Sequence, residues 1–124
     1  MAKILLAEDD DMSRDIIRTR LSRNGHEVTA VSNGQECLVK AHREPFDLFI
    51  LDISMPVKDG LQTLKELKTL PATSRIPALA LSAHSMDRDR KKAVEAGFDD
   101  FDTKPLNLPR LLEKISKLLA KTSS

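Results

Sequence analysis

The sequence predicts an α/β protein in which five strands form one parallel sheet with helices on both faces. Short runs of consecutive apolar residues alternate with longer segments whose apolar residues recur at helical spacing. Strands of a parallel sheet are covered on both faces, so uninterrupted apolar runs are typical of them. The strand–helix pattern repeats five times, and right-handed crossovers turn such a repeat into a doubly wound sheet.

The five expected strands differ in how clearly the sequence marks them. The run at residues 46–51 is the strongest, and the runs at 4–7 and 78–81 are also continuous. The run at 28–31 is weaker, and the one at 98–101 is the least clear.

Apolar stripes and end signals indicate the helices. Gly25 follows the first stripe, as glycine commonly follows the end of a helix. The second helix can start either from Ser32 with Gln35 or from Asn33 with Glu36, since both pairs fit a capping pattern. We interpret every stripe as core packing, including the clearest one, which is formed by Leu108, Leu111, Leu112, Ile115, Leu118 and Leu119.

Length and composition describe a small globular protein. The 124 residues suit one domain spanning 1–124, with a core at about 3–120. Twenty Lys and Arg residues balance 19 Asp and Glu residues, so we expect no direct nucleic-acid binding and no membrane attraction. The lone Cys37 suits a reducing compartment, and no apolar run approaches the roughly 20 residues of a membrane span. We therefore expect a cytoplasmic protein.

Polar residues follow four of the expected strands at their carboxyl ends. The acidic run 8–11 follows the first strand, Asp52 ends the third, Ser82 ends the fourth, and Lys104 follows the fifth. The flavodoxin-like strand order 2-1-3-4-5 is a common solution for such a sheet, and ligands bind at its carboxyl edge. This order places the acidic run beside Asp52, with Ser82 and Lys104 on the other side.

These residue types together suit phosphoryl chemistry with a divalent cation. Clustered carboxylates repel one another unless a cation neutralises them. Oxygen ligands without histidine or cysteine favour Mg²⁺, which also bridges carboxylates to phosphate. A carboxylate such as Asp52 can attack phosphorus, while Lys104 offers an ammonium charge and Ser82 a hydroxyl to the phosphoryl oxygens.

The chain resembles response-regulator receiver domains of the CheY-like superfamily over essentially its whole length, from Lys3 to about Ala120. No single motif is specific, but the order of the motifs and their places on the strand ends are. The 2-1-3-4-5 order is known from CheY itself, so that step rests partly on precedent. The resemblance is carried by Glu8-Asp9, Asp52-Ile53-Ser54-Met55-Pro56, Asp59-Gly60, Ser82-Ala83 and Lys104-Pro105.

The resemblance implies a role for each matching acidic residue. Asp52 corresponds to the phosphoacceptor. Asp9 and Asp52 correspond to ligands of Mg²⁺, with the backbone carbonyl of Ser54 as a third ligand. Glu8 corresponds to the second acidic residue, which acts through a metal-bound water. Glu8 departs from the family pattern, in which Asp is commoner at this position. The longer side chain reaches further but still offers a carboxylate.

The resemblance also implies how the signal spreads. Ser82 corresponds to the hydroxyl that moves toward the phosphoryl group, and Lys104 to the lysine that pairs with it. Phe101 occupies the position of the switch aromatic residue and lacks the hydroxyl of the frequent Tyr. The bond before Pro105 is often cis in the family. We further hypothesise that Ser54 and His84 set the hydrolysis rate of the phosphoryl group.

The function implied is that of a two-component switch. A histidine kinase or histidine phosphotransfer protein phosphorylates Asp52, and the surface of the fourth helix, fifth strand and fifth helix then changes to bind a downstream protein. The family can also pair into homodimers through this surface. The protein is not an enzyme in the usual sense, because it catalyses only its own phosphorylation and slow dephosphorylation.

Three alternatives stay open at the level of sequence. The chain can be a receiver cut from a hybrid histidine kinase or another multidomain regulator, which keeps the same chemistry. It can be a flavodoxin-like cofactor binder, although the chain has no Trp or Tyr for flavin stacking. It can also be a phosphatase with an aspartate nucleophile, although residue 54 is Ser where such enzymes carry a second Asp.

Overall fold

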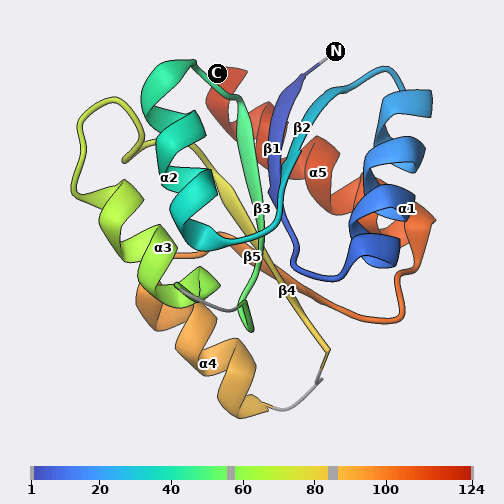
Figure 1. The fold of residues 1–124 in the computed structure, drawn as a ribbon. Coiled ribbons are helices and arrows are strands. Elements are labelled where there is room, and N and C mark those ends of the chain that lie inside the picture. The colour runs from blue at the N-terminus through green and yellow to red at the C-terminus, as the bar shows by residue number, and fades with distance from the viewer. Residues whose placement is uncertain (1, 56–57, 84–86, 124) are drawn as a thin grey trace.

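The computed structural model describes residues 2–55, 58–83 and 87–123, and within them strands and helices alternate along the chain (Figure 1). The elements are β1 Lys3–Ala7, α1 Asp11–Arg23, β2 Glu27–Val31, α2 Gly34–Arg43, β3 Leu48–Asp52, α3 Gly60–Lys68, β4 Ala78–Ser82, α4 Asp87–Ala96, β5 Asp100–Thr103 and α5 Leu108–Ser123. In the described ranges, no helix is long and apolar enough to cross a membrane.

The five strands form one sheet in the order β2-β1-β3-β4-β5, and every neighbouring pair is parallel. The predicted fold and strand order are therefore confirmed. Helices α1 and α5 cover one face, and α2, α3 and α4 cover the other (Figure 1). All residues of β3 and β4 are buried, whereas the edge strand β2 is mostly half-exposed, which explains its weaker apolar pattern.

Two hydrophobic clusters lie on opposite faces of the sheet. Alternate residues of each strand point to opposite faces, so in β1 Leu5 belongs to one cluster and Ile4 to the other. The first cluster takes Leu64 from α3, and the second takes Leu111 from α5. Cys37 is a buried member of the first cluster, and burial raises the pKa of its thiol to about 12.

The last strand lies two residues later than predicted. The sequence predicts a strand at 98–101, but β5 spans Asp100–Thr103. Phe98 is buried in the first hydrophobic cluster while its backbone N–H still bonds to Ala93 O of α4. The apolar character of this residue thus reflects core packing just after the helix rather than strand pairing, and the prediction of the strand bounds was wrong for that reason.

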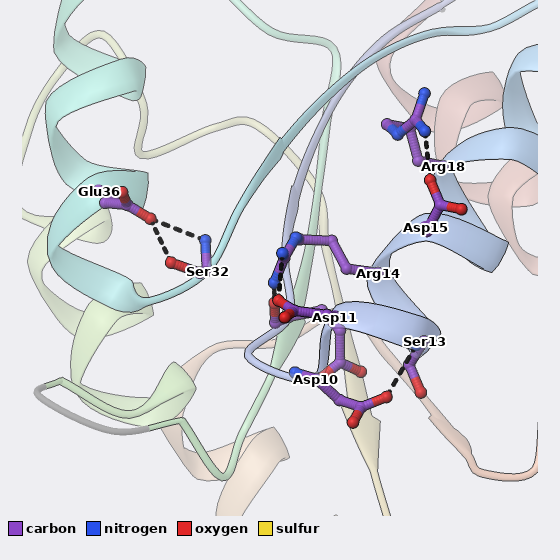
Figure 2. Close-up of polar contacts among 9 residues, drawn as sticks. Asp10, Asp11, Ser13, Arg14, Asp15, Arg18, Ser32 and Glu36 are labelled. Carbon is purple, nitrogen blue, oxygen red and sulfur yellow. Dashed lines mark hydrogen bonds and ion pairs between the residues drawn. The ribbon is translucent and has the colours of Figure 1, made fainter.

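Asp10 caps the first helix, which begins at Asp11. Asp10 accepts a hydrogen bond from Ser13 N at 2.8 Å, as the N-cap of α1 (Figure 2). Asp11 is instead the first helical residue and pairs with Arg14 at 2.5 Å. Hydrogen bonding to Ser13 holds the pKa of Asp10 below its usual value.

The start of α2 decides between the two capping pairs left open by the sequence. Asn33 is the N-cap and accepts from Glu36 N at 2.9 Å. Ser32 donates through both its backbone N–H and its hydroxyl to Glu36 Oε1 (Figure 2). The Ser32 hydrogen bonds lower the pKa of Glu36, so the carboxylate and the preceding loop stabilise each other.

Gly60 lets α3 begin directly against the end of β3. A Cβ atom at this position would lie 2.4 Å from the backbone oxygen of Asp52 and 2.9 Å from Ile53 Cα. Since these are backbone atoms, a side chain cannot be accommodated without moving the strand end. The preceding residue, Asp59, caps α3 by accepting from Gln62 N at 2.8 Å.

We expect Gly60→Ala to lower the free energy of unfolding by about 1–3 kcal/mol, because the added methyl group collides with the backbone of Asp52. Urea unfolding followed by circular dichroism measures the change. Lys65→Ala, on the exposed side of the same helix, is the control and should stay within about 0.5 kcal/mol of wild type. Equal stability of Gly60→Ala and wild type would contradict the close approach.

Candidate functional site

The carboxyl ends of four strands bring the predicted polar residues to one edge of the sheet. Asp52 ends β3, and Ser82 ends β4. Glu8 and Asp9 directly follow β1, and Lys104 directly follows β5. The backbone bonds Ile53 N to Leu81 O (3.0 Å) and Lys104 N to Ser82 O (2.8 Å) continue the strand pairing to this edge.

Lys104 lies between two carboxylates from different strands. Its ammonium donates to Asp52 Oδ2 at 2.8 Å and forms an ion pair with Glu8 Oε1. Glu8 is fully buried and Asp52 is 4% exposed. The bond between Lys104 and Pro105 is cis. Two buried carboxylates close together repel each other, so the shared ammonium is the charge that makes their proximity tolerable.

Burial dominates the protonation of Glu8. It raises the pKa of this carboxyl to about 7, although the hydrogen bond to Lys104 acts in the opposite direction. Asp52 adds to the increase through hydrogen bonding and charge. For Lys104, burial alone would lower the pKa, but the hydrogen bonds and charges of Asp52 and Glu8 outweigh burial and raise it. Glu8 therefore changes charge close to neutral pH.

The three acidic residues form a set that fits a divalent cation. Carboxylate oxygens of Glu8, Asp9 and Asp52 lie within 4.8 Å of one another. When all three are ionised, their three negative charges exceed the single positive charge of Lys104 by two. The set offers oxygen ligands only and Asp9 is exposed to solvent, which suits a hard cation that keeps some of its waters. The residues thus fit Mg²⁺.

Ser54 lies beside this set. Its backbone N–H donates to Asp52 Oδ1 at 2.8 Å, so both oxygens of Asp52 accept hydrogen bonds. The backbone carbonyl of Ser54 as a metal ligand stays a prediction. His84, the partner of Ser54 in the hydrolysis-rate hypothesis, lies outside the described residues, as does Pro56.

Ser82 and Phe101 both contact the first turns of α4. Ser82 is fully buried, and its hydroxyl donates to Asp89 Oδ2 at 3.2 Å. Phe101 is buried as well, with the Arg90 guanidinium 5.4 Å from its ring centroid. Neither Asp89 nor Arg90 was predicted from the sequence to be a site residue. The sequence feature that could have indicated them is their place in the first turns of a helix that begins five residues after Ser82.

Arg14 of α1 holds the loop after β1 through a hydrogen bond and an ion pair. Arg14 Nη1 donates to the backbone oxygen of Glu8 at 3.0 Å, and its other terminal nitrogen pairs with Asp11. Asp10 N donates to Glu8 Oε2 at 3.1 Å. Asp10 and Asp11 therefore serve the helix start, and neither belongs to the set of clustered carboxylates found in the described part of the chain.

Residues 4–116 match the response regulator receiver domain family. The chain belongs to this family. It is 36% identical over its full length to the transcriptional regulatory protein CpxR homolog of Haemophilus influenzae, of which it covers 53%. It is 33% identical over 96% of its length to hybrid signal transduction histidine kinase I of Dictyostelium discoideum, of which it covers 7%. The chain thus spans about half of one relative and a small part of the other.

Among solved structures, the chain is similar to the receiver domain of sensor histidine kinase PA1611 from Pseudomonas aeruginosa. The TM-score is 0.90 at 28% identity, with 96% of this chain and 98% of the other covered. That structure has a magnesium ion coordinated in its active-site cleft. The family match decides for the receiver prediction over the flavin-binding and phosphatase alternatives, and places the chain in two-component signal transduction.

The raised pKa of Glu8 predicts how the stability of the metal-free receiver depends on pH. Unfolded Glu8 ionises near pH 4.5 and folded Glu8 near pH 7. Folding therefore favours the neutral carboxyl: its full contribution is present below pH 4.5 and is lost as the pH rises to 7. Glu8→Gln stays neutral throughout, so wild type should lose up to about 3 kcal/mol relative to it over this range.

Urea unfolding in EDTA at pH 5, 6, 7 and 8 measures this difference. We expect the gap between Glu8→Gln and wild type to widen up to pH 7 and to stay constant above it. Glu36→Gln is the matched control, because the pKa of Glu36 is lowered rather than raised. A gap for Glu8→Gln that does not change with pH would show that Glu8 is ionised throughout.

Proposed function

We propose that this receiver is a Mg²⁺-dependent phosphorylation switch with Asp52 as the phosphoacceptor. The observation that carries the proposal is the buried carboxylate of Asp52 at the end of β3, held by Lys104 Nζ at 2.8 Å next to Glu8 and Asp9. We take residues 1–124 as one receiver domain that acts in the cytoplasm. A histidine kinase or histidine phosphotransfer protein is the donor, and a downstream protein reads the result.

The transfer itself needs one nucleophile and compensation of charge. A carboxylate oxygen of Asp52 attacks phosphorus, a P–O bond forms as the P–N bond of phosphohistidine breaks, and the imidazole takes up a proton as it leaves. Lys104 already neutralises part of the negative charge around Asp52, so the incoming anion is repelled less. The ammonium of Lys104 and the hydroxyl of Ser82 then serve the phosphoryl oxygens.

Magnesium, held by Asp9, Asp52 and the backbone oxygen of Ser54 with Glu8 acting through a water, would supply positive charge against the phosphoryl oxygens. Hydrolysis resets the switch: water attacks phosphorus, inorganic phosphate leaves and the Asp52 carboxylate is restored. In this sense the protein turns over only its own modification and is not an enzyme that acts on a separate substrate.

Output follows from the residues that contact α4. Movement of Ser82 and repacking of Phe101 change the surface of α4, β5 and α5, where a protein target or a second copy of the chain binds. Ser82 and Phe101 both contact α4 side chains, Asp89 and Arg90 respectively, which supports a path from the site to this surface. The balanced charge of the chain favours protein partners over direct binding of nucleic acid.

An exposed apolar patch beside Lys104 suits the phosphodonor. Met12 is 73% exposed and Ile16 is 47% exposed, both on α1. Ile16 also lines a shallow cavity of about 290 Å³ together with Lys104 and the two residues that follow it, Pro105 and Leu106. A donor that delivers phosphohistidine to Asp52 has to contact the surface next to Lys104, so we assign this patch to docking of the donor.

Acetyl phosphate tests the acceptor without a protein donor. We expect wild type to gain one phosphoryl group only when magnesium is present, and Asp52→Asn to gain none, because its amide is not a nucleophile. Intact mass spectrometry measures the adduct, because the chain has no Trp whose fluorescence could report phosphorylation. An adduct that forms equally on Asp52→Asn, or no adduct on wild type, would rule out Asp52 as the acceptor.

Ile16→Arg tests the docking patch. The donor in this test is a phosphorylated histidine phosphotransfer protein that is active on wild type. A charge buried in the donor interface should slow phosphorylation by this donor by about tenfold or more. Acetyl phosphate should phosphorylate the variant at the wild-type rate, because it needs no docking. Val39→Arg is the control, since Val39 is an exposed apolar residue on α2, which covers the opposite face of the sheet from α1. Equal slowing with both donors would mean that the site itself is damaged.

A further inference from the structure

The carboxylate of Asp89 ties the end of β4 to the first turn of α4. Asp89 is the third residue of α4 and is half-buried, and its Oδ2 accepts the hydrogen bond from the buried Ser82 hydroxyl. The next residue, Arg90, places its guanidinium over the ring of Phe101. Two consecutive residues of one helix therefore contact both side chains that the switch has to move.

The contact of Asp89 opposes the role of Ser82 in the phosphorylated state. A serine hydroxyl carries one proton, and an ionised carboxylate can only accept. While Ser82 donates this proton to Asp89, it does not donate it to a phosphoryl oxygen. Asp89 and the phosphoryl group thus compete for the same donor, and a group that stabilises only one of two states shifts the balance between them.

We propose that Asp89 is a positioning residue that holds Ser82 in its unphosphorylated orientation and thereby sets how readily the receiver responds to phosphorylation. The inference rests on the proposed function, since it requires a phosphoryl group on Asp52 to draw Ser82 away. It adds to that function a residue on α4 that acts against the active state. Removing the carboxylate should make the active state easier to reach.

A purely structural role for Asp89 predicts the opposite result. Asp87 and Asp89 both lie in the first turn of α4, where negative charge stabilises the helix. If helix stabilisation were the whole role, either substitution would loosen α4, and neither would strengthen binding at Asp52. Asp87 is therefore the matched control: it shares the helix turn and the charge, but its side chain is exposed, whereas the Ser82 hydroxyl donates to Asp89.

Beryllium fluoride with magnesium, which mimics a phosphoryl group on a carboxylate, measures the balance directly. Titrations followed by amide NMR should show half-saturation of Asp89→Ala at about fivefold lower concentration than wild type, the factor expected when one hydrogen bond is removed from one of two states. Asp87→Ala should bind as wild type does. Without ligand, the amide signals of β4 and α4 in Asp89→Ala should shift part of the way toward the saturated wild-type positions.

A double-mutant cycle separates the contact from other effects of the substitution. In a Ser82→Ala background, Asp89→Ala should change half-saturation no further, because the hydroxyl for which it competes is gone. Asp89→Asn keeps the size of the side chain and weakens the acceptor, so about a twofold effect is expected if Asp89→Ala folds poorly.

The inference is overturned if folded Asp89→Ala and Asp89→Asn both bind beryllium fluoride as wild type does or more weakly. It is also overturned if the effect of Asp89→Ala persists in the Ser82→Ala background. A wild type that shows no magnesium-dependent saturation would instead overturn the proposed function, so the two failures are distinguishable.

Discussion

The position of the Lys104 ammonium between Asp52 and Glu8 is the constraint on which the rest of the site depends. Two buried carboxylates cannot stay close and ionised without a compensating charge, and removing the partner of a buried ion typically costs about 3–5 kcal/mol. The three residues follow or end β5, β3 and β1, which are not consecutive in the chain. The 2-1-3-4-5 sheet order brings their strand ends to one edge of the sheet, so the charge arrangement depends on the topology.

Backbone packing supplies the accuracy that this charge arrangement needs. Gly60 allows α3 to start against the carbonyl of Asp52, and the bond from Lys104 N to Ser82 O fixes the lysine to the end of the neighbouring strand. Arg14 holds the backbone of Glu8 from α1. Each acidic residue thus sits at a strand end whose loop is fastened to a helix, which limits how far the carboxylates can move apart to relieve their repulsion.

The sequence predicted the alternation of strands and helices and the polar residues at the strand ends. It failed to predict which of several neighbouring residues of the same type takes a given structural role. Apolar runs and the polar residues that follow them were sufficient for the sheet and for the cluster around Asp52. Phe98 misled the strand assignment, because an apolar residue after a helix and one in a strand look alike in sequence. Adjacent acidic residues hide which one caps α1: Asp10 is the cap, whereas Asp11 forms an ion pair with Arg14 that spacing alone does not indicate. The bond from Ser82 to Asp89 depends on how α4 packs beside β4, which no local pattern encodes.

The charge balance of the site also explains why a cation and a phosphoryl group should depend on each other. With Glu8, Asp9 and Asp52 ionised and Lys104 protonated, the site carries two negative charges before any phosphoryl group arrives. A phosphoryl group adds further negative charge to a partly buried region, where repulsion is screened less than in water. A divalent cation reduces this penalty, and by linkage the factor by which the cation favours the phosphoryl group equals the factor by which the phosphoryl group favours the cation. The Ser82 hydroxyl is already engaged by Asp89, so one of the groups that would meet the new anion must first leave an existing acceptor.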